Sequence, residues 1–152
     1  MAKNEGKKFE EDWKNSVPDN VFIERINDTF YSEVVNIADF IMYAFPNLFL
    51  LELKSVKGRS IPFSRLNGKQ LKMLEVASKK KGVRAGFLFN FREVEQTYYI
   101  NVHDVIDYIR TADRKSFPLD WCKEKGLLVK QTKKISRYRY NVSELLGVLS
   151  GE

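Results

Sequence analysis

The segment Leu48-Phe49-Leu50-Leu51-Glu52-Leu53-Lys54-Ser55 constrains the fold more than any other stretch of this chain. It is an apolar run of strand length that carries a Glu-x-Lys sequence. Residues two apart on a strand point to the same side, so Glu52 and Lys54 face one way while Leu51 and Leu53 face the other. The pattern therefore predicts a strand that presents a carboxylate and an amine together.

A second carboxylate precedes this strand. Asp39 lies 13 residues before Glu52, in a segment (38–43) that also has a strand pattern. A turn at Phe45-Pro46-Asn47 would join the two strands as a hairpin and bring Asp39 beside Glu52. Two carboxylates and Lys54 at one sheet edge can hold a divalent metal ion and a nucleophilic water, which is the equipment for metal-assisted hydrolysis of a phosphodiester.

The other elements follow from hydrophobic periodicity and from turn residues. The order is a helix, three strands, a helix, two strands and then short helices, which predicts an α/β fold with a mixed central sheet and helices on both faces. The length, 152 residues, indicates a single domain over residues 1–152. The predicted strands are 21–26, 38–43, 48–56, 84–91 and 97–102, and the predicted helices are 4–14, 67–81, 103–111, 118–125 and 141–149.

Composition narrows the class of protein. A hydrophobic content of 43% and an aromatic content of 13% indicate a folded globule rather than a disordered chain. The single cysteine, Cys122, excludes an internal disulfide, fits a reducing cytoplasm and is expected to be a packed thiol. The polar N-terminus does not read as a secretory signal, and no apolar run reaches the roughly 18–20 residues of a membrane span. We therefore expect a cytoplasmic protein with no membrane contact.

Charge is distributed unevenly along the chain, whose net charge is +6. Residues 1–55 carry six basic and ten acidic side chains, a net charge of −4, and residues 56–152 carry a net charge of +10. The acidic part holds the candidate metal site, while the basic part suits contact with a polyanion. Simple solubility explains the same excess equally well.

Two more polar residues are placed so that they could join this site. Glu10 lies on the first predicted helix, and Gln70 lies at the start of the helix that follows the Glu-x-Lys strand. Each has an ordinary explanation when taken alone, as a solvated residue on a helix surface. Their order along the chain together with Asp39, Glu52 and Lys54 is far less expected by chance.

With these residues in place, the sequence resembles the PD-(D/E)xK nuclease superfamily and, within it, the RecU Holliday junction resolvases of bacteria and their phage relatives. The Asp–Glu–Lys triple is shared across the superfamily, whereas the other segments are more specific to the resolvases. The likeness covers most of the chain, and its motifs are Asn4-x-Gly6-Lys7-x-Phe9-Glu10, Asp39…Glu52-Leu53-Lys54, Ser60-Ile61-Pro62-Phe63, Lys69-Gln70-Leu71 and Lys115-Ser116-Phe117-Pro118-Leu119.

The resemblance implies a restriction-endonuclease-like fold and a metal site that takes Mg²⁺, for which Mn²⁺ would substitute. Asp39 and Glu52 would bind the metal with help from the backbone carbonyl of Leu53. Glu10 would contribute directly or through water.

The same resemblance assigns roles to two further side chains. Lys54 would orient or activate the attacking water and stabilise charge on the phosphorus oxygens, and Gln70 would position the water or the scissile phosphate. Chemistry agrees, because developing negative charge on phosphorus needs fixed cations beside it.

The sequence departs from the family between the first strand and the metal aspartate. RecU proteins carry a long stalk there that is thought to enter the junction centre, whereas only about residues 27–37 occupy this interval here. Ile37-Ala38 also stand where threonines precede the aspartate in typical members. A shortened stalk leaves junction preference to the shape of a dimer and to the basic surface.

Basic residues suggest where DNA would run. One group flanks the catalytic strand and the next helix, and a second group, interleaved with Tyr138 and Tyr140, resembles a DNA-contacting strand or arm. An edge strand that uses basic residues to block aggregation explains the second group equally well. The predicted DNA contacts are Lys57, Arg59, Arg65, Lys69, Lys72, Lys133, Lys134, Arg137 and Arg139.

The sequence thus predicts an Mg²⁺-dependent, structure-selective endonuclease that resolves four-way DNA junctions by paired nicks as a homodimer. The dimer would use an apolar patch built partly from Phe9 and Trp13 or from Phe30 and Tyr31, although each pair is equally open to packing inside one subunit. The alternatives are a restriction-type or general branched-DNA endonuclease of the same fold and a non-catalytic DNA-binding module.

Overall fold

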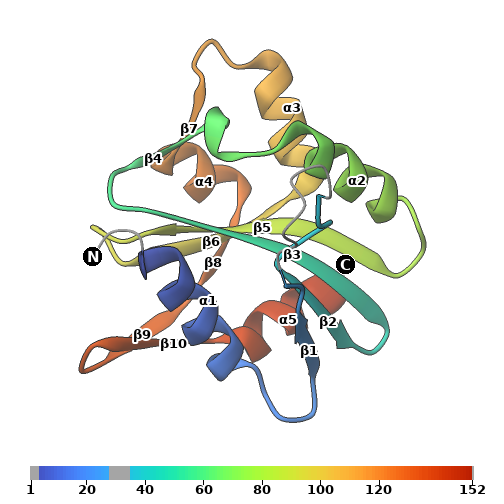
Figure 1. The fold of residues 1–152 in the computed structure, drawn as a ribbon, viewed down its shortest axis with the longest axis vertical. Coiled ribbons are helices and arrows are strands. Elements are labelled where there is room, and N and C mark those ends of the chain that lie inside the picture. The colour runs from blue at the N-terminus through green and yellow to red at the C-terminus, as the bar shows by residue number, and fades with distance from the viewer. Residues whose placement is uncertain (1–3, 28–34, 152) are drawn as a thin grey trace.

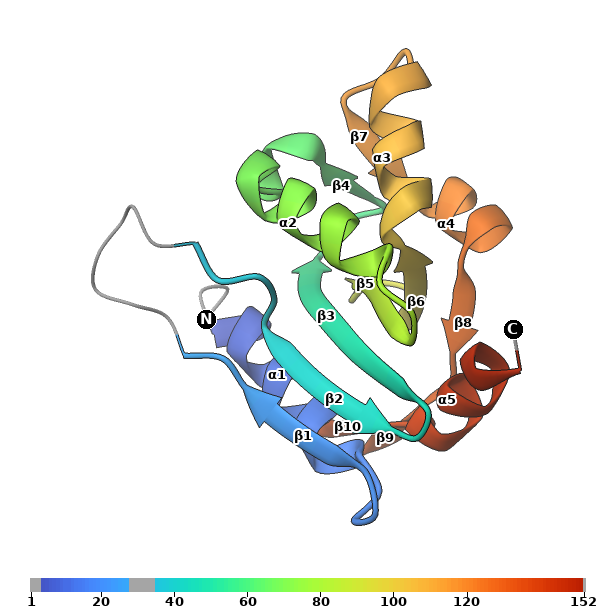
Figure 2. The ribbon, with the colours of Figure 1, turned by 90° about the vertical axis from the view of Figure 1, so that its right-hand side faces the viewer.

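A six-stranded mixed sheet forms the centre of the computed structural model, which describes residues 4–27 and 35–151 (Figures 1 and 2). The strand order is β1-β2-β3-β5-β6-β8, with β3 and β5 parallel and all other neighbours antiparallel. The predicted α/β fold with a mixed central sheet is therefore confirmed. The strands are β1 (Phe22–Arg25), β2 (Phe40–Ala44), β3 (Asn47–Val56), β5 (Val83–Phe91), β6 (Gln96–Asn101) and β8 (Leu127–Val129).

Helices cover both faces of this sheet, as the sequence predicts. Figure 1 shows α2, α3 and α4 above the sheet and α1 and α5 below it. The helix α2 ends three residues earlier than its pattern predicts, and Gly82, in the left-handed region at φ 82°, follows it. The helices are α1 (Glu5–Ser16), α2 (Gly68–Ser78), α3 (Val102–Thr111), α4 (Leu119–Lys125) and α5 (Val142–Ser150).

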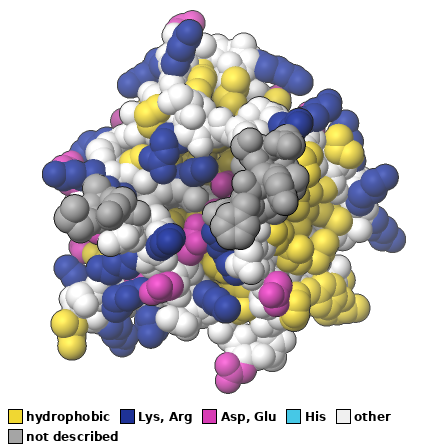
Figure 3. Space-filling model, in the orientation of Figure 1, with side chains coloured by type: hydrophobic (Ala, Val, Ile, Leu, Met, Phe, Trp, Pro, Cys, Tyr) yellow, Lys and Arg dark blue, Asp and Glu magenta, His cyan; other side chains and the backbone are white. Residues whose placement is uncertain are grey.

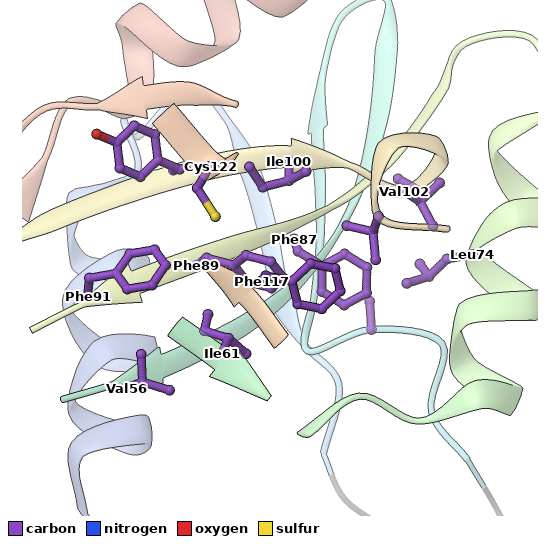
Figure 4. Close-up of a cluster of buried hydrophobic side chains, with 14 of the residues drawn as sticks. Val56, Ile61, Leu74, Phe87, Phe89, Phe91, Ile100, Val102, Phe117 and Cys122 are labelled. Atoms are coloured by element: carbon purple, nitrogen blue, oxygen red, sulfur yellow. The ribbon is translucent and has the colours of Figure 1, made fainter. Parts of the chain in front are cut away.

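The alternation of β3 explains why the core has two halves. Leu50 and Val56 belong to the hydrophobic cluster under α2, α3 and α4. Figure 4 shows side chains of this cluster. Leu51 and Leu53 join the cluster under α1 and α5. Because successive strand residues face opposite sides, Glu52 and Lys54 lie on the side of Leu50, as expected.

Five short strands that the prediction either omits or leaves open complete the fold. Segments of three or four residues hold too few side chains to show a period, so pattern alone does not reveal them. The strand β8 lies at the edge of the central sheet, next to β6. The others form two-stranded ribbons, β4 (Ser60–Pro62) with β7 (Ser116–Pro118) and β9 (Gln131–Lys134) with β10 (Arg137–Tyr140).

The aromatic residues of α1 lie inside the subunit, which makes one predicted dimer patch wrong. Phe9 and Trp13 are buried against the sheet, and the Phe9 ring contacts the edge of Tyr140 with centroids 5.6 Å apart. Apolar residues at i and i+4 on a helix form one stripe, and here the sheet covers that stripe. The other predicted pair, Phe30 and Tyr31, lies outside the described residues.

The single cysteine, Cys122, has the structural role that the sequence predicts. Cys122 is fully buried, and burial raises the pKa of its thiol to about 12, in agreement with the expected packed role. No helix among the described residues is long and apolar enough to cross a membrane.

Candidate functional site

The hairpin of β2 and β3 brings Asp39 to Glu52. The register pairs Phe40 with Leu51, and the Asp39 N–H also donates to the Leu51 carbonyl oxygen at 3.1 Å. Two successive residues therefore face Leu51, as in a β-bulge, an irregularity that re-aims side chains and is frequent near active sites. Asp39 Oδ2 in turn accepts a 2.8 Å hydrogen bond from the Leu53 N–H.

Glu52 is held from two sides. Its Oε2 lies 3.2 Å from Lys54 Nζ, the next residue on the same face of β3. Its Oε1 accepts a 2.9 Å hydrogen bond from Gln70 Nε2, which also donates to the Asn36 carbonyl oxygen at 3.2 Å. The structure thus brings together four of the five predicted catalytic side chains, because Asp39, Glu52, Lys54 and Gln70 form one contact network.

Gln70 reaches Glu52 because of where α2 begins. The side chain of Asn67 caps α2 by accepting a 3.0 Å hydrogen bond from the Gln70 N–H. An asparagine at this position satisfies one of the free N–H groups of the first turn and fixes the start of the helix. The Gln70 side chain is then directed at the β3 carboxylate and is itself buried.

The two carboxyl groups have raised pKa values. For Asp39, burial is the main cause and the neighbouring Glu52 the second, and the pKa rises to about 6. Burial also raises the pKa of Glu52, although Lys54 and the hydrogen bond from Gln70 oppose the rise. Two adjacent acids that are withdrawn from solvent and resist ionisation are typical of a site that gains from a bound cation.

Arg25 is a member of this site that the sequence analysis missed. Its Nε lies 2.9 Å from Glu10 Oε1 and its Nη2 lies 3.9 Å from Asp39 Oδ1. A lone arginine on a short strand gives no signal in the sequence. The Arg25 guanidinium therefore lies between the carboxylates of Glu10 and Asp39. The predicted part of Glu10 in binding a metal stays a prediction.

The donor set suits a hard divalent cation. Within the described ranges no three His, Cys, Asp or Glu side chains are grouped closely enough to hold a metal ion. Mg²⁺ commonly binds through one or two carboxylates and keeps several waters, so Asp39 and Glu52 are sufficient protein ligands. The predicted contribution of the Leu53 carbonyl stays a prediction.

The basic residues near β3 line a groove beside its last residues. The groove has a volume of about 510 Å³ and includes Lys57, Arg65 and Arg92 on its walls. Arg65 lies 3.4 Å from the Ser55 carbonyl oxygen, and Arg92 Nη1 donates to Ser55 Oγ at 2.9 Å, so both guanidinium groups gather at the residue after Lys54. Arg92 is a second basic residue that the sequence analysis missed.

The other basic residues predicted to contact DNA near the site are exposed, and two of them form ion pairs. Lys69 and Lys72 lie on α2, where Lys72 Nζ is 3.5 Å from Glu75. Arg59 is 3.9 Å from Glu93. Exposed pairs of this kind are weak, so these cations remain available to an incoming phosphate.

The second predicted basic group lies on the β9–β10 hairpin. Lys133, Lys134 and Arg139 are exposed. Arg137 instead pairs with α1, with its Nε 2.7 Å from Asp12 and its Nη2 2.9 Å from Glu11. Arg137 therefore holds the hairpin to the helix, and its predicted contact with DNA would have to compete with these carboxylates.

Comparison with known proteins bears on the fold and on the family of this chain. The fold is similar to that of a Holliday junction resolvase, Hjc of Archaeoglobus fulgidus, with a TM-score of 0.53 and 15% identity over 84% of this chain and 94% of that one. The SPbeta prophage-derived uncharacterized protein YotM of Bacillus subtilis (strain 168) is 32% identical over 171 residues, which cover 97% of this chain and 88% of YotM. The family model of Recombination protein U matches residues 23–141. The chain therefore belongs to the RecU family of Holliday junction resolvases.

Proposed function

We propose that residues 1–152 form a single Mg²⁺-dependent endonuclease domain that cuts branched DNA and resolves four-way junctions by paired nicks in the cytoplasm. The observation that carries the proposal is the contact network of Asp39, Glu52, Lys54 and Gln70, of which Glu52 and Gln70 are buried, near a basic groove at the end of β3. Family membership supports branched DNA as the substrate.

The residues of the chain have distinct tasks in this proposal. Asp39 and Glu52 would hold the metal ion, which when bound makes a water more acidic and neutralises charge on a phosphate. Lys54 keeps a positive charge beside Glu52 on the same strand face, where it can stabilise the negative charge that develops on phosphorus. Gln70 orients the Glu52 carboxylate through its hydrogen bond and would position the water or the scissile phosphate.

The groove beside the site offers a path for the DNA backbone. Lys57, Arg65 and Arg92 come from different parts of the chain and surround the end of β3. Cations that surround a catalytic strand attract phosphates and hold one of them against the metal ligands. Each junction has two strands to cut at related positions, so a homodimer with one site per subunit is the simplest arrangement that gives paired nicks.

The test is cleavage of end-labelled four-way, three-way, flap and linear duplex DNA of shared sequence, with Mg²⁺, with Mn²⁺ and with a chelator. We expect metal-dependent cleavage with a preference for the four-way junction. Equal cleavage of linear duplex would favour a restriction-type or general branched-DNA nuclease. DNA binding without cleavage under any metal condition would favour a non-catalytic binding module.

Two variants examine the site itself. Asp39→Asn and Glu52→Gln each remove a carboxylate and should reduce cleavage by orders of magnitude while junction binding stays nearly intact, because binding depends on lysines and arginines. Asp19→Asn is the matched control, since Asp19 is exposed in the turn after α1. Cleavage by either site variant at close to the wild-type rate would show that the assigned ligands are wrong.

A further inference from the structure

The tip of the β9–β10 hairpin carries an isoleucine in an unusual position. The register pairs Lys134 with Arg137, so Ile135 and Ser136 form a two-residue turn. The Ile135 side chain is 98% exposed, the most exposed large hydrophobic residue in the described part of the chain. Its φ is 56°, in the left-handed region.

Neither the turn nor the core accounts for this residue. Two-residue hairpin turns favour glycine or asparagine at positive φ, because a β-branched side chain is strained there. An apolar side chain that is almost fully exposed also gains nothing from burial. A position that opposes both local preferences is a candidate for function.

The hairpin beneath the tip is firmly attached to α1. Asp12, which is buried, accepts hydrogen bonds from Arg137 Nε at 2.7 Å and from the Tyr138 N–H at 3.1 Å. Ser16 Oγ accepts another from the Tyr140 N–H at 2.9 Å. The tip is therefore an apolar projection on a rigid base rather than the end of a loose loop.

Cations surround the projection. Lys133 and Lys134 precede Ile135 and are exposed, and exposed Arg139 follows on the other strand. Figure 3 shows an apolar projection at the lower left, where Figure 1 places the hairpin, with Lys and Arg side chains around it. An apolar tip surrounded by positive charge suits DNA, because its negatively charged phosphates flank an apolar stack of bases.

We propose that the β9–β10 hairpin is a DNA wedge, in which Ile135 inserts between base pairs at the branch point while Lys133 and Lys134 contact the adjacent phosphates. Apolar side chains inserted between base steps unstack them at a cost of about a few kcal/mol per step. The cost is smallest where stacking is already interrupted, as at a branch. The wedge would therefore make the protein bind branched DNA more tightly than continuous duplex. This inference rests on the proposed function above.

The test measures binding with a chelator present, using a four-way junction that carries 2-aminopurine beside the branch and a linear duplex of the same sequence. Wild-type protein should raise the 2-aminopurine fluorescence on the junction, because unstacked 2-aminopurine is brighter. Ile135→Gly should lose this rise and should reduce the ratio of junction to duplex affinity by about tenfold. Ile135→Leu keeps an apolar tip and should retain both.

The glycine variant is also expected to fold normally, so that misfolding would not explain a loss of junction preference. Glycine adopts positive φ without strain, so Ile135→Gly should melt at the wild-type temperature or above. An unchanged fluorescence rise and affinity ratio in Ile135→Gly would overturn the wedge and would favour a protein as the partner of the hairpin. If wild-type protein also cuts junctions in that case, the wedge alone fails and the proposed function stands.

Discussion

Asp39 and Glu52 are acids that the fold holds close together, with Glu52 buried and Asp39 half-buried. Loss of solvent opposes the ionisation of both acids, and repulsion from Glu52 opposes that of Asp39 as well, while Lys54 beside both acids and Arg25 beside Asp39 offset only part of the cost. A protein that maintains such a pair without a cation gives up stability at neutral pH. This cost connects the proposed metal site to a measurement that needs no DNA.

Stability without metal should fall as pH rises from about 4 to about 6. The pKa of Asp39 is about 6 in the folded protein and near 3.8 when unfolded, so the folded state binds the extra proton in this window. The contribution of Asp39 to the free energy of unfolding therefore falls by on the order of 3 kcal/mol as pH rises through the window, and this contribution is constant at higher pH. Urea unfolding at pH 4, 5, 6 and 7 with a chelator measures the change.

Substitution separates Asp39 from the other acids. Asp39→Asn should flatten this part of the profile and should be more stable than wild type at pH 7, whereas Asp19→Asn should follow wild type. Mg²⁺ should stabilise wild type more at pH 7 than at pH 5, because protons compete for the same carboxylates. A profile for Asp39→Asn that matches wild type would contradict the assigned cause of the pKa shift.

The helix α2 combines a structural and an electrostatic task. Its first turn directs Gln70 at Glu52, and Lys69 and Lys72 stand exposed on the same helix. At the other end, Lys79 and Lys80 are also exposed and follow the last helical residue. Two lysine pairs therefore lie at opposite ends of α2, one close to the site and one about three turns away.

The pair Lys69→Ala and Lys72→Ala should weaken junction binding and reduce its salt dependence. Each lost phosphate contact lowers the slope of log affinity against log salt concentration by about 0.9. The pair Lys79→Ala and Lys80→Ala makes the same charge change and should leave the slope near that of wild type. Fluorescence anisotropy over a salt series measures both, and equal slopes for the two double variants would place the DNA path elsewhere.

At the scale of the whole molecule, exposed apolar residues gather at one edge of the sheet. Phe22 and Tyr43 are partners in the β1–β2 register, and Phe45 follows in the β2–β3 turn with 85% of its surface exposed. The strand β1 is an edge strand of the six-stranded sheet. Since Phe9 and Trp13 are buried, this edge is a better candidate for the predicted dimer contact.

We expect a homodimer in solution, and we expect Phe45→Asp to weaken it. A charge placed in an apolar contact must lose its water, so the dissociation constant should rise by at least about tenfold. Leu128→Asp is the control, because Leu128 is an exposed apolar residue on β8, at the opposite edge of the sheet from β1. Sedimentation at micromolar concentration measures the state, with a cruciform plasmid assay alongside. A strict monomer that nicks only one strand would exclude paired resolution by this route.

The sequence by itself determined the parts of this protein that depend on short-range pattern. Alternation along residues 48–55 placed Glu52 and Lys54 on one face, and a turn at 45–47 joined that strand to the one before it. Long periodic segments also became the predicted helices and main strands, because each must bury one face. The family likeness lay in the spacing of Asp39, Glu52, Lys54 and Gln70.

Only the tertiary structure decided which distant residues meet. Arg25 reaches Asp39 because β1 pairs with β2, and Arg92 reaches Ser55 because β5 lies parallel to β3. The sequence also left open whether Phe9 is buried inside the subunit, because an apolar stripe on a helix fits a subunit core and a dimer interface alike. Strand pairing and helix docking depend on the packing of the whole chain, and the local sequence carries no record of the partner.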